Sequence, residues 1–339
     1  MLKDKKTKDT PKEVKVVKRS RKPRVVKEDD LFYFIDSDTI KSEKITAPRY
    51  SYWRSVFKVF FKKKTNIVLL SSLILMILVA LIFPLFCPYN PNENVNLTDS
   101  YNQSPAAAMN MFGGFSLKYL LGTGSIGNSI FYGIWASTQT SILLAIVCAT
   151  INMTVGIILG AVWGYSKKFD AVMMVIYNIV ANVPYILVVS VLVYVIGSGF
   201  WSFVLAMTMT GWMGIAYFFR TQVIIIRDRE YNLASKCLGT PIVRVVTKNV
   251  LPFLTSVIVT ILASELPSYI GAEVFLSYIG IGLSATVPSL GRMIQEAQTA
   301  FIMFPWAFWP PVAIASIVTI ILYVVGQNLA DASDPRTHM

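Results

Sequence analysis

The chain has 339 residues, a net charge of +12 and a mean hydropathy of +0.56, and 54% of its residues are hydrophobic. Several apolar runs of roughly 20 residues exclude an ordinary soluble protein and indicate a polytopic helical membrane protein. The cysteines Cys87, Cys148 and Cys237 fall in different places of the expected topology, so we expect free thiols. The only histidine is His338, which argues against a histidine-dependent metal or catalytic site.

Lysine and arginine are concentrated in residues 1–28, against few acids. Such a segment can be a nucleic-acid arm, but the apolar runs that follow favour a cytosolic tail attracted to anionic lipid. We therefore expect membrane lipid, and no nucleic acid, as a partner. No signal peptide is expected, because the first apolar run begins near Ile67 and no cleavage site follows it. We assign residues 1–56 to a basic cytosolic extension, in which 31–55 can form an interfacial helix.

Six apolar segments are long enough to cross a bilayer. They lie at about 67–86, 137–164, 171–196, 201–220, 252–277 and 307–328. Basic residues cluster before the first segment and after the second and fourth, whereas 87–136 and 278–306 carry little positive charge. The positive-inside rule then puts the basic connections and both termini in the cytosol. We expect the first span and a long extracellular loop at 57–136, a core transmembrane domain at 137–330, and a cytosolic tail at 331–339.

Small residues and prolines mark particular spans. Gly156, Gly160 and Gly164 lie on one face of the second span and allow a neighbouring backbone to approach closely. Packing within one bundle is the simpler interpretation, and a subunit interface is the alternative. Pro184 and Pro267 each remove a backbone hydrogen bond from the third and fifth spans, which predicts kinks there.

Two carboxylates, Glu265 and Glu273, fall within the fifth span. A carboxylate at membrane depth should face protein or water rather than lipid. Both are therefore candidates for lining a translocation path. The alternative is that each pairs with a buried donor or, for Glu273, lies near the outer interface. The sequence contains no Walker-type G-x-x-x-x-G-K-[S/T] loop, no H-E-x-x-H and no G-x-S-x-G, so any ATP hydrolysis must occur on another chain.

The polar segment 227–252 connects the fourth and fifth spans. Its pattern predicts a short amphipathic helix, a break at Gly239, and a second helix that leads into the next span. The small residues Ala234 and Ser235 allow close approach to another surface. Such a helix can sit in a groove on a partner protein or lie on lipid headgroups, and the residues alone do not separate these two interpretations.

Segment 227–252 resembles the EAA signature of ABC-importer permeases, E-A-A-x-x-x-G followed by I-x-L-P. The closest variant is that of the oligopeptide/dipeptide permease family, in its C-type (OppC/DppC-like) subunit. The residues at positions of the signature are Arg229, Glu230, Tyr231, Leu233, Ala234, Ser235, Leu238, Gly239, Leu251 and Pro252. Leu233 replaces the glutamate of the signature, and Ser235 replaces its second alanine.

Further ordered matches extend the resemblance over roughly residues 118–336. They are Gly211-Trp212-x-Gly214 with Arg220, then Glu273 with Leu276-Ser277, then Pro288-Ser289-x-Gly291, and Asp331-Ala332-Ser333-Asp334-Pro335-Arg336. The family's G-T-D-x-x-G-R-D element, which precedes the second span, is reduced here to Gly122-Thr123-Gly124 and Gly127-Asn128. Leu290 stands where the family's P-S-W-G motif has its tryptophan.

The resemblance implies an all-α type I ABC-importer (MetI-like) permease fold with six transmembrane helices in a bacterial plasma membrane. It implies a heterodimer with a B-type permease subunit. Two cytosolic ABC ATPase subunits would grip the EAA segment and hydrolyse ATP with Mg, and an extracellular substrate-binding lipoprotein would deliver peptide. The chain itself would bind no cofactor and no metal and would have no enzymatic activity.

Three other functions remain open on the sequence. The same fold can import dipeptides, nickel or another small solute. A secondary transporter driven by an ion gradient would predict inverted repeats and several buried charges, and no clear repeat is visible. A scaffold tethered by residues 1–28 would need that tail alone to carry the function.

Overall fold

The structure of the protein, a computed structural model, describes residues 51–91 and 100–334. These residues belong to one compact unit that begins at Ser51. They are mostly helical and contain no β-strand, which confirms the all-α prediction for this part of the chain. The expectations for residues 1–50, and for the tail beyond residue 334, lie outside the described residues.

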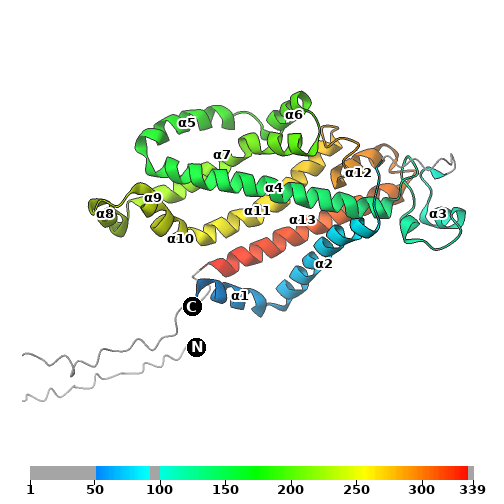
Figure 1. Ribbon diagram of the computed structural model, residues 1–339, viewed down its shortest axis with the longest axis horizontal. Helices are drawn as coiled ribbons and strands as arrows, with labels where there is room; N and C mark the ends of the chain where they lie inside the picture. The colour runs from blue at the N-terminus through cyan, green and yellow to red at the C-terminus, as the bar shows by residue number, and fades with distance from the viewer. Residues whose placement is uncertain (1–50, 92–99, 335–339) are drawn as a thin grey trace, which may run out of the picture. The chain divides into compact units, whose positions relative to one another are not determined.

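The helices are labelled in chain order in Figure 1. They are α1 (Tyr52–Lys62), α2 (Lys64–Phe86), α3 (Pro105–Met111), α4 (Ile130–Tyr165), α5 (Lys167–Ala181), α6 (Tyr185–Ile196), α7 (Phe200–Arg227), α8 (Glu230–Cys237), α9 (Ile242–Val245), α10 (Leu251–Phe253), α11 (Thr255–Tyr278), α12 (Leu290–Ala297) and α13 (Pro305–Ser333). Short 3₁₀ turns η3 (Leu117–Tyr119) and η5 (Gln298–Ala300) and a π-helical turn η4 (Val246–Val250) complete the set.

Five helices, α2, α4, α7, α11 and α13, are long and apolar enough to cross a membrane, and the bent pair α5 and α6 supplies a sixth candidate. These correspond to the six predicted segments. Three helices, α4, α7 and α13, run well past the predicted limits, because an apolar window measures hydrocarbon thickness rather than helix length. Helix α4 begins at Ile130. Ser129 is its N-cap, and the Ser129 hydroxyl accepts a hydrogen bond from the Tyr132 amide at 3.2 Å. Helix α7 continues beyond residue 220 to Arg227.

The proline in the third predicted span does more than kink the helix. Helix α5 ends at Ala181, α6 begins at Tyr185, and the two axes differ by 80°. Pro184 itself is the N-cap residue of α6, a position where its missing N–H costs no helical hydrogen bond. By contrast, α11 passes through Pro267 as a single helix.

Helices α4 and α7 lie in close contact along the row of glycines. A Cβ atom added at Gly156 would lie 2.7 Å from Cγ2 of Ile215, one at Gly160 would lie 2.5 Å from the Ala216 carbonyl oxygen, and one at Gly164 would lie 2.7 Å from the Arg220 carbonyl oxygen. No Cβ fits at these distances. The structure therefore accounts for all three glycines by packing inside the chain.

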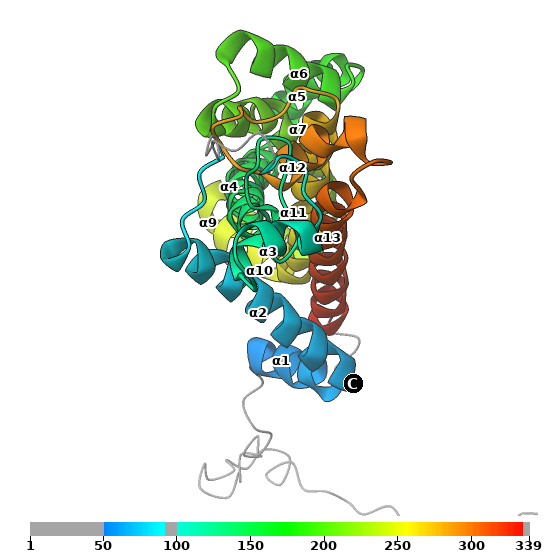
Figure 2. The same ribbon diagram turned by 90° about the vertical axis from the view of Figure 1, so that its right-hand side faces the viewer.

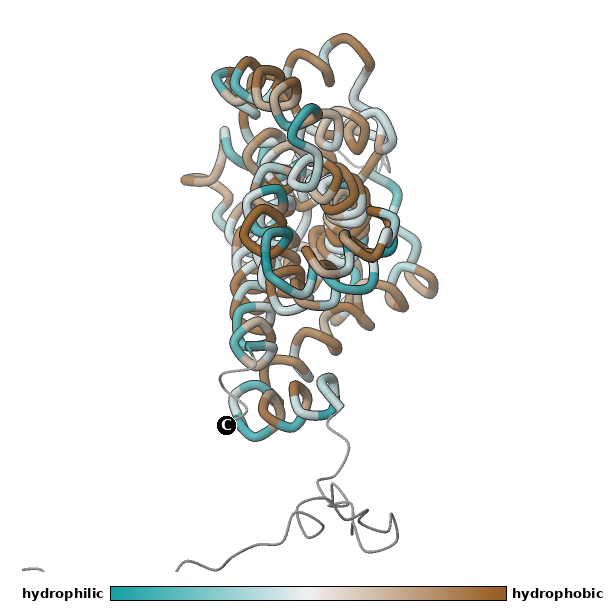
Figure 3. The backbone as a smooth tube through the Cα atoms, turned by 90° about the vertical axis from the view of Figure 1, so that its left-hand side faces the viewer, coloured by the Kyte–Doolittle hydropathy of each residue, from teal (hydrophilic) through white to brown (hydrophobic). Residues whose placement is uncertain are grey.

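The other helices pack around this pair (Figures 1 and 2). Helix α11 contacts α4 and pairs with α13, where a Cβ at Gly326 would lie 2.8 Å from that of Ala263. Helix α2 contacts α4 and α13, and α6 lies on α7, where the Tyr185 hydroxyl donates to the Met207 carbonyl at 2.9 Å. Hydrophobic residues, brown in Figure 3, occupy long stretches of these helices.

Polar clusters join the helices at two places. Near the start of α5, Arg220 donates from Nε and Nη2 to the two oxygens of Asp170 at 2.5 and 2.9 Å, and Trp163 Nε1 donates to the same carboxylate at 2.7 Å. This forked ion pair ties α4, α5 and α7 together.

The second cluster surrounds the fully buried Glu273 of α11. Ser141 of α4 and Ser277 of α11 each donate to its carboxylate at 3.0 Å. The Ser289 hydroxyl and the Gly291 amide, at the start of α12, also hydrogen-bond to it. Two sequence motifs that lie apart in the chain, around Glu273 and around Gly291, therefore form one structural unit.

Candidate functional site

The candidate site is the α7–α11 connection, which we define as residues 228–254. Helix α8 is followed by a turn at Gly239, by α9, by the π-helical turn η4 and by α10. The predicted order of helix, glycine break and second helix is present. Two details differ from the prediction. The second helix contains a π turn, and Leu254 separates α10 from α11, so that the long helix begins at Thr255 rather than at 252.

Helix α8 ends in a Schellman motif. The Thr240 amide donates to the Ser235 carbonyl at 3.1 Å, and the Gly239 amide donates to the Lys236 carbonyl at 3.0 Å. Gly239 has φ +76°, the left-handed conformation that this motif requires and that glycine adopts without strain. Nothing lies within 4 Å of a Cβ built there, so the constraint at this position is conformational rather than steric.

One buried amide fixes α8 to the rest of the chain. Asn232 is 1% exposed, and its Nδ2 donates to the Ile226 carbonyl of α7 at 2.9 Å. Its Oδ1 accepts from Nδ2 of Asn249, in the π turn, at 3.1 Å. The sequence interpretation missed both asparagines. The available signal was a polar residue between the exposed positions Tyr231 and Leu233 of an amphipathic helix.

Two arginines make contacts at the start of the connection. The Arg229 guanidinium carbon lies 5.0 Å from the ring centroid of Phe253, which brings the first and last turns of the connection together. Arg227, at the end of α7, donates from Nη1 to the Gly164 carbonyl at the end of α4 at 2.7 Å. The first contact thus joins the two ends of the connection to each other, and the second fixes the end of α7, from which the connection starts, to the end of α4.

Most of the predicted signature residues form an exposed surface on this anchored base. Tyr231 and Leu233 are 46% and 45% exposed, and Leu238 is 86% exposed. Glu230, Ala234 and Gly239 are also exposed, whereas Ser235 is half-buried and donates to the Tyr231 carbonyl at 3.0 Å. Leu251 and Pro252 form the start of α10. An exposed apolar surface on a rigid base is suited to binding another protein.

The two carboxylates of α11 lie in different surroundings. Glu273 has no exposed surface and is held by hydroxyl and amide donors. Glu265 is half-buried beside Tyr269, whose hydroxyl accepts from Nδ2 of Asn152 at 2.5 Å. The structure therefore does not bring Glu265 and Glu273 together in one site. Among the described residues, no group of three or more His, Cys, Asp or Glu side chains is arranged to hold a metal ion.

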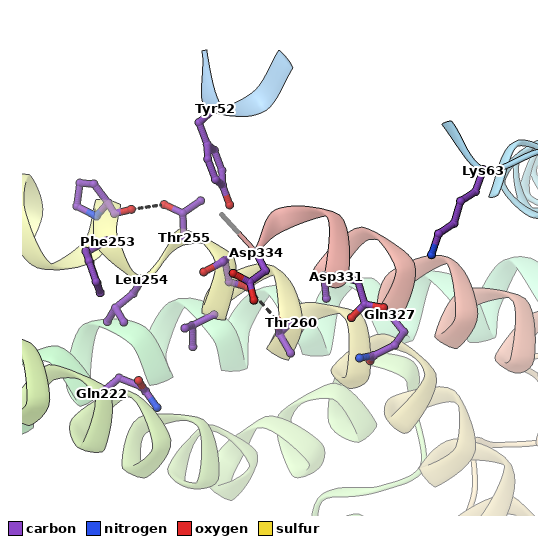
Figure 4. Close-up of a pocket in the computed structure, with 14 residues that line it drawn as sticks. Tyr52, Lys63, Gln222, Phe253, Leu254, Thr255, Thr260, Gln327, Asp331 and Asp334 are labelled. Carbon is purple, nitrogen blue, oxygen red and sulfur yellow. Dashed lines mark hydrogen bonds between the residues drawn. The ribbon is translucent and has the colours of Figure 1, made fainter. Parts of the chain in front are cut away.

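A cleft of about 1020 Å³ opens beside the α7–α11 connection. Figure 4 shows the side chains around it, which come from α1, α7, α10, α11 and α13 and from Lys63. Pro252, Phe253 and Leu254 form one side of the cleft. Much of the remaining lining is polar, with Gln222, Thr260 and Gln327 among the residues that contribute.

Two sequence families match the chain. The family described as "Binding-protein-dependent transport system inner membrane component" matches residues 152–339, which is more than half of the chain. The family described as "N-terminal TM domain of oligopeptide transport permease C" matches residues 51–105. The first match contains the whole α7–α11 connection, and the second contains α1 and α2.

Curated relatives match along almost their whole length. The oligopeptide transport system permease protein AmiD of Streptococcus pneumoniae is 45% identical over 314 residues, which cover 91% of this chain and 97% of that protein. The oligopeptide transport system permease protein OppC of Bacillus subtilis is 31% identical, covering 87% of this chain and 93% of that protein. The dipeptide transport system permease protein DppC of Bacillus subtilis is 30% identical, covering 91% and 93%.

Proposed function

We propose a peptide-import function for this chain, which belongs to the family of inner-membrane components of binding-protein-dependent transport systems. Its apolar spanning helices make it a membrane-embedded permease subunit. We propose oligopeptides as the cargo, because two of the relatives above are oligopeptide permeases. Dipeptides are the second candidate, because a dipeptide permease matches over a similar length.

The anchored and exposed α8 is the observation that carries the proposed mechanism. A separate ATPase that grips α8 would move α7 as well, because Asn232 joins α8 to α7. It would also move α10, which precedes α11, because Arg229 at the start of α8 contacts Phe253 of α10. We propose that the ATPase subunits, and not this chain, bind and hydrolyse ATP with Mg. Closure of those subunits would then shift the bundle between two arrangements that open to opposite sides. The chain would bind no cofactor or metal of its own.

The exposed face of α11 supports a path beside Glu265. Thr260, Ser264 and Ser268 follow one another on this face, and their hydroxyls donate to carbonyl oxygens of the same helix. A hydroxyl-rich face on a spanning helix suits water or protein better than lipid. We therefore propose that Glu265 lines the path and that the cleft beside the connection is its inner opening. The full burial of Glu273 favours a structural role for that residue.

The remaining partners follow from the same proposal. A B-type permease subunit would complete the path, two cytosolic ABC ATPase subunits would bind the connections of the two permeases, and an extracellular substrate-binding lipoprotein would deliver the peptide. Both termini and the α7–α11 connection would then lie in the cytosol of the bacterial cell, as the distribution of basic residues favours.

The Gly239→Val substitution tests the coupling role. A β-branched residue in the left-handed conformation costs roughly 1–2 kcal/mol, so the Schellman motif should open and the surface of α8 should change. We expect peptide-stimulated ATPase activity and peptide uptake by the reconstituted complex to fall at least about tenfold, while the amount of assembled complex is unchanged. Gly239→Asn is the matched control, because asparagine tolerates positive φ, and it should retain most of the activity.

Normal uptake by the Gly239→Val complex would contradict the coupling role. Uptake that follows a proton or sodium gradient and is indifferent to ATP would instead favour a secondary transporter. Stimulation of the ATPase by a small solute but by no peptide would contradict the proposed cargo and leave the coupling role intact.

A further inference from the structure

Helix α1 has two exposed rows of different chemistry that the transport mechanism does not use. Trp53, Phe57 and Phe61 are 48%, 48% and 45% exposed and follow one another at the four-residue spacing of a helix face. Their rings are neighbours, with centroids 6.2 Å apart for the first pair and 6.3 Å apart for the second. The aromatic row is therefore one continuous surface rather than three scattered side chains.

A basic row runs beside the aromatic row. Arg54, Lys58 and Lys62 are exposed and have the same four-residue spacing, each one residue after an aromatic side chain. No acidic residue occurs in α1. The exposed half of the helix is thus divided lengthwise into an aromatic surface and a cationic surface.

The third face of α1 is fixed to the bundle. Val56 and Phe60 are buried in a cluster with Ile321 and Val325 of α13. The Tyr52 hydroxyl donates to the Ser333 carbonyl at the end of α13, and Nδ2 of Asn66 donates to the Phe60 carbonyl across the α1–α2 corner. These contacts determine which way the two exposed rows point.

The neighbouring helices place α1 at a membrane surface. Helix α2 begins only two residues after α1 ends, and 11% of its apolar window is buried inside the chain. Lys63, between them, is extended, so the chain changes direction there, and α1 lies beside the end of α13 (Figures 1 and 2). An aromatic row beside a basic row, at the end of two spanning helices, matches the boundary between acyl chains and headgroups.

We propose that α1 is a docking surface for anionic phospholipid, with the aromatic row inserted at the acyl boundary and the basic row against headgroup phosphates. The charge of the helix is what selects this occupant. Two of the three basic side chains are lysines, which are depleted at protein–protein interfaces, whereas lysine and arginine are both attracted to an anionic leaflet. Lipid binding at α1 does not depend on the cargo or on the coupling mechanism.

Photo-crosslinking of the assembled complex in lipid nanodiscs identifies the occupant. Azidophenylalanine at Phe57 should form adducts with phospholipid, and it should favour phosphatidylglycerol over phosphatidylcholine in mixed bilayers. Azidophenylalanine at Phe60 is the matched control, because that side chain is 3% exposed and faces α13, and it should form no lipid adduct. Protein adducts at Phe57 with another subunit, or lipid adducts without a preference for the anionic headgroup, would overturn the proposal.

Charge substitutions test the basic row separately. The combined variant Arg54→Gln, Lys58→Gln, Lys62→Gln should lower the preference for phosphatidylglycerol at Phe57 by about fivefold for each charge removed, since each basic side chain near an anionic surface is worth roughly 1 kcal/mol. The charge-preserving variant Arg54→Lys, Lys58→Arg, Lys62→Arg should keep the preference. A preference that survives neutralisation, or that is lost equally in both variants, would show that the basic row does not bind lipid.

Discussion

At the scale of single residues, Glu273 shows how a carboxylate is accommodated inside a membrane helix bundle. Burial of a charge is costly unless hydrogen bonds replace the lost water. Here hydroxyl donors from α4 and α11 and the first turn of α12 supply those bonds. The carboxylate also lies at the N-terminal end of α12, where a helix favours negative charge. Glu273 thereby fixes the position of α12 relative to two spanning helices.

Removal of this carboxylate should destabilise the fold. In Glu273→Ala, the Ser141 and Ser277 hydroxyls and the Gly291 amide lose their common acceptor, and an unsatisfied buried donor costs about 1–3 kcal/mol. We expect a clearly lower apparent melting temperature for the purified complex, measured by intrinsic fluorescence. Glu273→Gln retains an acceptor oxygen and should lose less than half as much. Equal melting temperatures for the alanine variant and the natural chain would refute this role.

The sequence predicted some of these residues and not their arrangement. It identified Glu273 as a carboxylate in a span and placed Gly291 in a separate motif, but only the fold brings them into contact. Asn232 was missed for a related reason, because its partners, the Ile226 carbonyl and Asn249, are defined by the turn between two helices. The end of α8 at Gly239 was predicted correctly, since a helix that ends in glycine has a local signature.

At the scale of helices, the glycine row of α4 decides how closely α7 approaches. A methyl group at Gly160 would meet the backbone of Ala216, which cannot move without separating the two helices. We expect Gly160→Ala to cost about 1–3 kcal/mol, as overpacking usually does, and to lower the yield of folded complex and its melting temperature. Gly214→Ala on α7 is the matched control, because nothing lies within 4 Å of its Cβ. A similar loss in both variants would attribute the effect to the loss of glycine itself rather than to helix contact.

The prediction of helices was more successful than the prediction of their ends and bends. Hydropathy identified all six apolar segments, because spanning helices must be apolar over the bilayer thickness. It did not identify the first turns of α4, where a serine cap and packing extend the helix. Pro184 predicted a disturbance in the third segment, but the 80° change of direction depends on how α6 packs on α7.

At the scale of the whole molecule, the orientation in the membrane can be tested with the natural cysteines. Cys237 is exposed at the end of α8, Cys148 is buried and Cys87 is partly buried at the opposite end of α2 from α1. In a Cys87→Ser chain, an impermeant maleimide added to intact cells should leave Cys237 unmodified, and permeabilised cells should show full modification. Modification of Cys237 in intact cells would place the α7–α11 connection outside, where no cytosolic ATPase can reach it.

The resemblance of the sequence to a permease family predicted the architecture as a whole, and the family matches agree with it. What the sequence could not give was the relation between distant parts of the chain. The contact between α1 and the end of α13, and the cleft beside the α7–α11 connection, both join segments separated by most of the chain. Such relations depend on tertiary packing rather than on local pattern.

The π-helical turn η4 has a consequence for changes in chain length. Its Leu251 amide donates to the Val246 carbonyl, so this turn holds one residue more than an α-helical turn would. Deleting a single residue here would let the turn revert to ordinary helical winding without breaking the chain. Because the π turn takes up its additional residue within a single turn, the segments on either side would keep nearly their present orientation. A deletion of one residue within α11 would instead rotate everything upstream by about 100°, the angle of one helical step. The π turn is therefore the place in this stretch where the chain can lose a residue while the surface of α8 keeps its direction.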